Sequence, residues 1–454
     1  MDFENFESFL LETMGDSKLP GLSVAIQEKG RLVYSKGFGF RDIQSAAPAT
    51  PATLYGIASI TKSFAGLAAS QLADEGKLSF HDPITKFVSA DVLPPSFRDV
   101  TLQHLVTHSS GLPTLGYIEA YASGFTGIDP QAWLPTATPE SVVSFMRESD
   151  GWRETRPGEG YFYLNEGYVL LGMAIAKASG VSFQEYVRRN ILEPLNMKRT
   201  FFTKKETEAE SDVATAYIIH DGNQTPTRYP YGFTADAGLV SNVLDLSNYL
   251  SMFLGGGLFE GRTIVSRRAL DEMVKPHVAV TKHPLFPGEA YGYGLVTVPD
   301  FFGQRLVQHS GSVFVHTGFI GFLPESNVSI AILENGSGYA PSDLGMYALA
   351  TAIGKDPGSL PFIRNDNIMK RVLGNYETYK RTKRAVVTRN GDLLNMRLSD
   401  RFPGENVTLI PERLEEDTAR FYALLSSRRY NAEFRLNKKP VEFMFDTYKF
   451  RKRD

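Results

Sequence analysis

Residues 57–76 read IASITKSFAGLAASQLADEG, and this stretch decides how the rest of the chain is interpreted. Small and apolar residues recur along it at helical spacing, so it predicts a long helix that begins at Ser59 and packs closely against its neighbours. Gly76 is the residue type that commonly follows the last turn of a helix. Ser59 and Lys62 fall on one face of the first turn, because positions i and i+3 are neighbours.

The pair of Ser59 and Lys62 is suited to nucleophilic catalysis. A serine hydroxyl is a weak nucleophile at neutral pH and needs an adjacent base. Burial lowers the pKa of a lysine, which makes proton exchange with the hydroxyl feasible, and the N–H groups at a helix start can stabilise an oxyanion. The spacing also has a simpler explanation, a serine N-cap followed by a surface lysine.

Two later segments carry side chains that suit the same chemistry. Residues 156–172, RPGEGYFYLNEGYVLLG, contain Tyr163 and Asn165 just before a predicted helix. A phenol can relay protons if a nearby cation lowers its pKa, and an Asn amide can hold a substrate carbonyl. The alternative for Tyr163 is a packing role in a tyrosine-rich loop.

The second of these segments, VQHSGSVF at residues 307–314, ends a predicted strand. His309 could complete a proton network, Gly311 permits close approach of a substrate, and the backbone N–H of Ser312 could stabilise an oxyanion. His316, which also precedes an x-Gly pair, is a rival for His309. We favour His309 because the chain then has room for a turn and a full return strand before Pro324.

Composition excludes several classes of protein. The chain has 454 residues, enough for two domains, and 42% of them are hydrophobic, as in globular proteins. It contains no cysteine, which excludes disulfides, thiol catalysis and cysteine metal sites. The net charge of −3 gives no general attraction to nucleic acid or to membranes. Residues 1–18 predict an amphipathic surface helix, not a signal peptide, so we expect a cytoplasmic location.

The order of apolar runs predicts an α+β fold in residues 1–355. Strand patterns lie near both ends of this region and helical patterns lie between them, which indicates one antiparallel sheet flanked by helices, with a helical subdomain. Residues 356–370 predict a linker. Residues 371–454 predict a small all-β barrel, because Asn390-Gly391 is a strong hairpin signal and several short strands follow at close spacing.

Three motifs, in chain order, resemble those of serine β-lactamases and penicillin-binding enzymes: Ser59-x-x-Lys62, Tyr163-x-Asn165 and His309-x-Gly311. Their flanks resemble the CubicO group of these hydrolases over roughly residues 15 to 355. The third motif begins with His where the classical lactamases have Lys, and His-x-Gly is more similar to certain peptidases and esterases. The added barrel makes the layout similar to that of an archaeal self-compartmentalising serine protease with a lipocalin-like C-terminal domain.

The resemblance implies a β-lactamase/transpeptidase-like fold and acyl-enzyme chemistry of the Ser-Lys-Tyr type, without metal or other cofactor. The expected catalytic residues are Ser59, Lys62, Tyr163 and His309, and the expected substrate-binding residues are Asn165, Gly311 and Ser312. It also implies a homo-oligomer that acts on short peptides, some with D-amino acids. Short-chain esters, β-lactams and cell-wall peptides are the alternative substrates, and a non-catalytic scaffold with the same fold is the alternative class.

Overall fold

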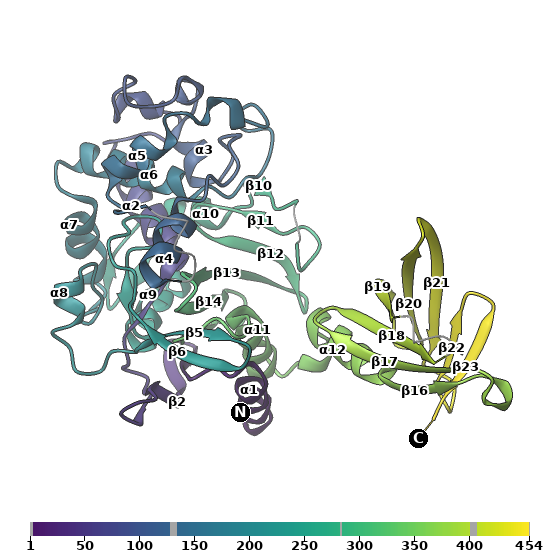
Figure 1. Ribbon diagram of the computed structural model, residues 1–454. Coiled ribbons are helices and arrows are strands. Elements are labelled where there is room, and N and C mark those ends of the chain that lie inside the picture. The colour runs from purple at the N-terminus through teal and green to yellow at the C-terminus, as the bar shows by residue number, and fades with distance from the viewer. Residues whose placement is uncertain (1–2, 128–133, 282–283, 400–405, 454) are drawn as a thin grey trace. The chain divides into compact units, whose positions relative to one another are not determined.

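The computed structural model describes residues 3–127, 134–281, 284–399 and 406–453 of the chain (Figure 1). The chain forms two compact units, residues 1–355 and residues 356–454. Each unit has its own cluster of buried apolar side chains.

One antiparallel sheet organises the first unit, and strands from both ends of the unit meet in its middle. From one edge to the other its strands are β10 (Val278–Ala279), β11 (Ala290–Tyr291), β12 (Val296–Phe301), β13 (Gln304–Ser312), β14 (Thr317–Leu323), β15 (Val328–Glu334), β1 (Gly21–Glu28), β2 (Arg31–Asp42) and β3 (Ala47–Pro48). In the central pair Leu22 lies opposite Glu334 and Val24 opposite Ile332. The predicted closure of the sheet by both ends of the unit is therefore confirmed.

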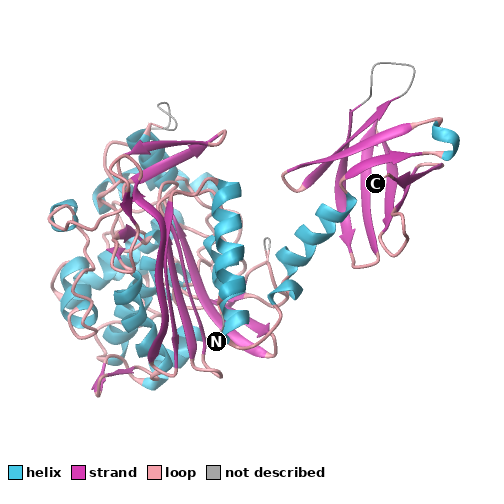
Figure 2. Cartoon of the chain, turned by 90° about the horizontal axis from the view of Figure 1, so that it is seen from below, coloured by secondary structure: helices cyan, strands magenta, loops and turns pink. Residues whose placement is uncertain are grey.

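Helices cover both faces of this sheet, as Figure 2 shows. The helices of the first unit are α1 (Glu4–Ser17), α2 (Thr61–Asp74), α3 (Leu102–Val106), α4 (Tyr117–Thr126), α5 (Pro139–Met146), α6 (Asn165–Ser179), α7 (Phe183–Val187), α8 (Lys204–Thr207), α9 (Val243–Leu254), α10 (Arg267–Val274) and α11 (Pro341–Ala352). Strand β14 is buried throughout because alternate side chains pack on opposite layers. Phe322 packs against Phe253 of α9, whereas Phe319 lies against Gly345 of α11.

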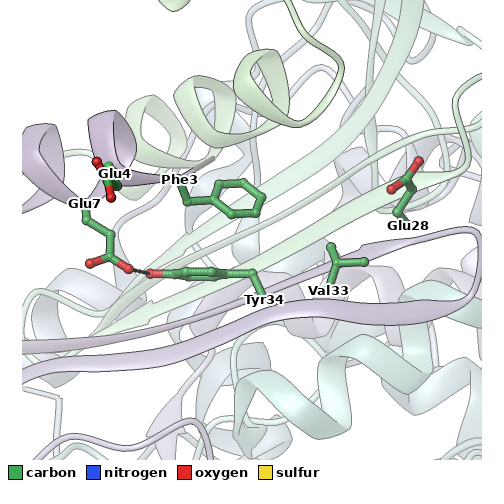
Figure 3. A pocket seen from close by; sticks show the side chains of 6 residues that line it. All are labelled: Phe3, Glu4, Glu7, Glu28, Val33 and Tyr34. Carbon is green, nitrogen blue, oxygen red and sulfur yellow. Dashed lines mark hydrogen bonds between the residues drawn. The ribbon is translucent and has the colours of Figure 1, made fainter. Parts of the chain in front are cut away.

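Helix α1 is the amphipathic helix predicted at the N-terminus, and it lies beside α11 (Figure 1). Phe9 stacks on Tyr347 of α11 with ring centroids 4.3 Å apart. On the other side, Tyr34 of β2 donates a 2.8 Å hydrogen bond to Glu7 beside a small surface pocket that Phe3 and Val33 also line (Figure 3). Helix α1 thus closes the sheet face opposite α9.

Short paired segments complete the first unit away from the main sheet. They are β4 (Tyr55–Gly56) with β7 (Val240–Ser241), β5 (Ala216–His220) with β6 (Asn223–Thr227), and β8 (Leu258–Phe259) with β9 (Arg262–Thr263). The β4–β7 pair ties the segment before Ser59 to the segment after Asp236, since Gly56 lies opposite Val240.

The second unit is a closed antiparallel barrel preceded by a helix. Its strands are β16 (Gly374–Glu377), β17 (Arg384–Asn390), β18 (Leu393–Ser399), β19 (Asn406–Leu414), β20 (Thr418–Leu425), β21 (Arg428–Arg435), β22 (Glu442–Phe445) and β23 (Tyr448–Lys452). Alternate side chains point inward and fill the interior, where Phe434 stacks on Phe443 with centroids 4.2 Å apart. The predicted barrel fold of this region is confirmed.

The region expected as a linker, residues 356–370, is largely helical. A 3-10 turn, Pro357–Ser359, leads into α12 (Pro361–Val372), which has proline at its first position. Ile368, Met369 and Val372 belong to the apolar core of the barrel unit, so this stretch is part of that unit. Proline and glycine here mark a turn and a helix start rather than an extended connection.

Among the residues described, no helix combines the length and the apolar character needed to cross a membrane.

Candidate active site

Ser59 lies in a 3-10 turn, Ala58–Ile60, that leads directly into α2. The residues on both sides of it are buried, while Ser59 itself is partly exposed. Ala58 has a φ of +48°, which is unusual for a residue with a Cβ and is a type of strain found at functional sites. The turn therefore presents one accessible hydroxyl at the start of a buried helix.

Lys62 follows Ser59 on the same face, as the spacing predicts, and its side chain is fully buried. Its Nζ lies 3.0 Å from Ser59 Oγ, 2.8 Å from Asn165 Oδ1 and 2.8 Å from the backbone oxygen of Asp236. The neutral amine can donate to the last two oxygens and accept the Ser59 hydroxyl proton. Burial lowers the pKa of Lys62 to about 7, an effect that the charges of nearby acids partly oppose.

Two buried carboxyl groups flank Lys62, and Tyr117 contacts both of them. The Tyr117 hydroxyl donates to Asp236 Oδ2, and the Tyr117 backbone N–H donates a 3.1 Å bond to Glu166 Oε1. Burial raises the pKa of Glu166 to about 7 and also raises that of Asp236. Asp236 does not cap the following helix, α9, because Asn242 fills that position.

Tyr163 lies close to the Ser59–Lys62 pair, with Lys62 Nζ 4.9 Å from the centre of its ring. Burial raises the pKa of Tyr163 well above its usual value, although an interaction with Ser59 partly opposes the rise. The sequence suggested that a nearby cation would lower this pKa, but burial, the largest influence on it, raises it instead. Tyr163 is thus a protonated phenol, suited to donating a proton.

His309 lies on β13, and its ring centre is 6.5 Å from that of Tyr163. Its Nδ1 is 2.5 Å from the Ser310 carbonyl oxygen, so Nδ1 carries the proton and Nε2 accepts the 2.9 Å bond from the Tyr291 hydroxyl. Burial lowers the pKa of His309 to about 3. Sequence reasoning missed Tyr291, whose only signal was its place in the YGYG stretch before the third motif.

The end of β13 runs against the turn that holds Ser59. A Cβ built on Gly311 would lie 2.2 Å from the carbonyl oxygen of Ile57 and 3.1 Å from the nitrogen of Ser59. The glycine is therefore needed for contact between strand and turn, not only for the approach of a substrate as the sequence suggested.

The backbone N–H of Ser312 points away from β14. Val313 donates to the carbonyl oxygen of His316, so in an antiparallel ladder Gly311 also faces β14 and Ser312 faces the other way. Strand β12 pairs with β13 only as far as Gln308, which leaves that side of Ser312 without a neighbouring strand.

The rival histidine lies in a different environment. His316 accepts a 2.9 Å bond from the backbone N–H of Gly56 and stacks on Tyr229, and its ring also lies near Tyr55. Another histidine, His104, accepts from the backbone N–H of Thr101 at the start of α3. No cluster of potential metal ligands occurs among the residues that the structure covers.

Fold and site together define the class of protein, and comparison with known families agrees. Residues 6–355 match the family described as Beta-lactamase, and residues 357–451 match the Pab87 octamerisation domain. The chain therefore belongs to the beta-lactamase family, as its three motifs indicated.

Individual relatives are similar over most of the chain. The octameric penicillin-binding protein homologue from Pyrococcus abyssi is 45% identical, with a TM-score of 0.91 over 99% of this chain and 100% of that one. The D-amino acid amidase from Ochrobactrum anthropi SV3 is 25% identical, with a TM-score of 0.61 over 78% of this chain and 100% of that one. Protein flp of Staphylococcus aureus strain MRSA252 is 26% identical over 74% of this chain. The matched region spans 64% of the length of Protein flp.

Substituting Gly311 by alanine should impair hydrolysis more than folding. The added methyl group would overlap the Ile57 carbonyl oxygen and push β13 away from Ser59. Displacements of about 1 Å at a reacting group can cost on the order of 10²-fold in rate, so we expect kcat/KM to fall by about that factor. Steady-state kinetics of the variant would measure the change.

Gly15→Ala is a matched control for this substitution. Gly15 lies in α1 and a Cβ there would meet no atom within 4 Å. Activity should stay unchanged, and stability should rise by up to about 1 kcal/mol because alanine favours the helix. Equal activity of Gly311→Ala and Gly15→Ala would contradict the close contact of β13 with the Ser59 turn.

The pH dependence of kcat/KM should have an acid limb near pH 7. Lys62 must be neutral to accept a proton, and its pKa of about 7 means that the active form is lost as the pH falls below that value. Removing the charge of Asp236, which raises the Lys62 pKa, should move the limb to lower pH. A pH profile of Asp236→Asn that is unchanged, or shifted upward, would contradict this assignment.

Proposed function

We propose that this protein is a serine hydrolase that acts through an acyl-enzyme on short peptides, including peptides that contain D-amino acids. The observation that carries the proposal is the 3.0 Å contact between the accessible Ser59 hydroxyl and a fully buried Lys62 whose pKa is lowered to about 7. A buried amine with this pKa is a suitable base for a serine nucleophile at neutral pH.

In the proposed first step, Ser59 Oγ attacks the carbonyl carbon of the scissile amide while its proton passes to the neutral Lys62. The carbonyl oxygen becomes an oxyanion, which the backbone N–H groups of Ser59 and Ser312 stabilise. Asn165 holds the substrate carbonyl through its amide N–H groups, because its Oδ1 already accepts from Lys62.

Collapse of the tetrahedral intermediate breaks the bond between carbon and nitrogen. Tyr163 donates its proton to the departing amine and recovers one from the Lys62 ammonium, so Lys62 is neutral again. Water then hydrolyses the ester on Ser59. His309, kept uncharged by burial, accepts the Tyr291 hydroxyl hydrogen through Nε2. The Tyr291 oxygen, held in place in this way, accepts from the attacking water and orients it.

The preference for peptides and D-amino acids rests on the relatives. The Ochrobactrum anthropi protein is named a D-amino acid amidase, and the Pyrococcus abyssi protein a penicillin-binding protein homologue. The first of these names states an amide substrate, whereas the second states only a likeness to penicillin-binding proteins. We therefore propose short peptide amides as the preferred substrates of this chain and esters as the second class of substrate.

The decisive experiment combines covalent labelling with a set of matched substrates. A fluorophosphonate should add its mass to the peptide that contains Ser59, and a D-aminoacyl amide should be hydrolysed faster than its L-enantiomer, a short-chain ester or a cephalosporin. The absence of label under every condition would favour a non-catalytic scaffold. If Ser59 were labelled but the ester were the preferred substrate, the serine hydrolase assignment would stand and the peptide substrate would be wrong.

We also propose that the chain assembles as a homo-octamer through its barrel unit. Support comes from the match of residues 357–451 to an octamerisation domain and from the octameric relative. Sedimentation of the full chain should then give a mass of about 400 kDa, eight times 50.4 kDa. A chain that ends at residue 355 should sediment as a smaller species, and a monomeric full-length chain would refute the assembly.

A further inference from the structure

His108 lies beside Tyr163 and takes no part in the proton transfers proposed above. It is fully buried, and its ring centre is 4.1 Å from that of Tyr163. Its φ of +57° is uncommon for a residue with a Cβ, so the surrounding structure must stabilise this conformation. These features indicate that His108 has a role other than packing.

The backbone on both sides of Tyr163 is hydrogen-bonded to this one residue. The N–H of Phe162 donates a 2.8 Å bond to the His108 carbonyl oxygen, and the N–H of Leu164 donates a 3.0 Å bond to His108 Nδ1. The carbonyl oxygen of Tyr163 accepts from the hydroxyl of Thr114, six residues further along the same loop. Each peptide unit around the phenol is thus held by the segment that begins at His108.

The protonation state of His108 follows from these contacts. Since Nδ1 accepts from Leu164, the ring proton lies on Nε2, which has no hydrogen-bond partner among the described residues. Burial, with Lys62 and His309 nearby, keeps the pKa of His108 well below its usual value, so the ring stays neutral. A neutral ring can keep accepting from Leu164 over the whole working pH range.

We infer that His108 is a positioning residue for Tyr163, which fixes the phenol where it can donate a proton to the leaving group. Two backbone bonds set the path of the chain on either side of Tyr163, and the imidazole lies against the face of the phenol ring. This inference rests on the proposed hydrolase function. It predicts that loss of His108 affects reactions that need leaving-group protonation more than reactions that do not.

The test compares one acyl group presented as an amide and as a p-nitrophenyl ester. The amine needs a proton to depart, whereas p-nitrophenolate leaves without one. In His108→Leu, kcat/KM for the amide should fall by about tenfold to hundredfold, because its leaving group needs the misplaced proton donor. The kcat/KM for the ester should fall by less than about threefold, because its leaving group needs no proton. Tyr163→Phe should show the same selectivity, and His108→Leu added to it should cause little further loss.

Two more variants separate positioning from general destabilisation. His108→Asn keeps an acceptor at the position of Nδ1 and tolerates a positive φ, so it should recover most of the amide activity. His104→Leu removes a histidine one turn earlier that bonds Thr101 but is not bonded to the Tyr163 segment, and it should leave the amide-to-ester ratio unchanged. Equal losses on amide and ester in His108→Leu would overturn the inference.

A crystal structure of His108→Leu gives a readout that does not depend on turnover. The Tyr163 ring should move away from Ser59, and an unmoved ring would overturn the inference even if no substrate were cleaved. Failure of the proposed function would be recognised separately, because the unmodified protein would then hydrolyse neither the amide nor the ester.

Discussion

Replacing Ser59 by alanine should abolish hydrolysis while the protein stays folded. Removal of a catalytic nucleophile costs on the order of 10⁴-fold or more in kcat. Alanine is readily accommodated in the 3-10 turn, and Lys62 would keep two of its three oxygen partners, Asn165 and the Asp236 carbonyl. The loss should therefore appear in kcat and in fluorophosphonate labelling, but not in the unfolding temperature.

Ser63 provides a matched control for this prediction. It lies one turn further along α2, is fully buried, and donates to the carbonyl oxygen of Ile60. Because a reagent cannot reach it, Ser63→Ala should still hydrolyse substrate and take up the label. If Ser59→Ala retained activity on every amide and ester that the unmodified protein cleaves, the assignment of the nucleophile would be wrong.

Replacing Lys62 by methionine should lower kcat/KM on the order of 10³-fold, the usual contribution of a well-placed general base. Methionine has a similar length and suits a fully buried position, so the change removes the proton acceptor with little loss of packing. The residual activity should rise with hydroxide concentration and lose the acid limb near pH 7. Measurement of kcat/KM between pH 5 and 9 would show both effects.

An exposed lysine tests whether the effect is specific to the buried amine. Lys177 lies on the surface of α6, and Lys177→Met should leave both activity and pH profile unchanged. Persistence of the acid limb in Lys62→Met would mean that another group, such as the coupled carboxyl of Glu166, governs it.

The local part of the site could be predicted from the sequence. Ser59 and Lys62 are three residues apart, so helical geometry alone puts them on one face. The order of strand and helix patterns was enough to predict the main sheet and the barrel. The strands of both bury apolar side chains, and these leave a recognisable pattern in the sequence. The resemblance of three ordered motifs then supplied Tyr163, Asn165 and His309 as partners.

Contacts between distant segments could not be predicted in this way. Asp236 and Tyr117 lie 119 residues apart in the chain, and no periodicity joins them. Tyr163 has a raised pKa where the sequence suggested a lowered one, because burial is the largest influence on that pKa. The role of Gly311 depends on how closely β13 approaches Ile57, which is a property of the packed sheet.

The pairing of Leu22 with Glu334 has a consequence for how the protein is synthesised. The ribosome delivers Ser59 early and His309 late, and the central strand pair cannot form until residue 334 has left the exit tunnel. Contacts between such distant segments also form slowly. A nascent chain therefore carries its serine and lysine in an unfinished scaffold, and hydrolytic activity is withheld until translation of the first unit is complete.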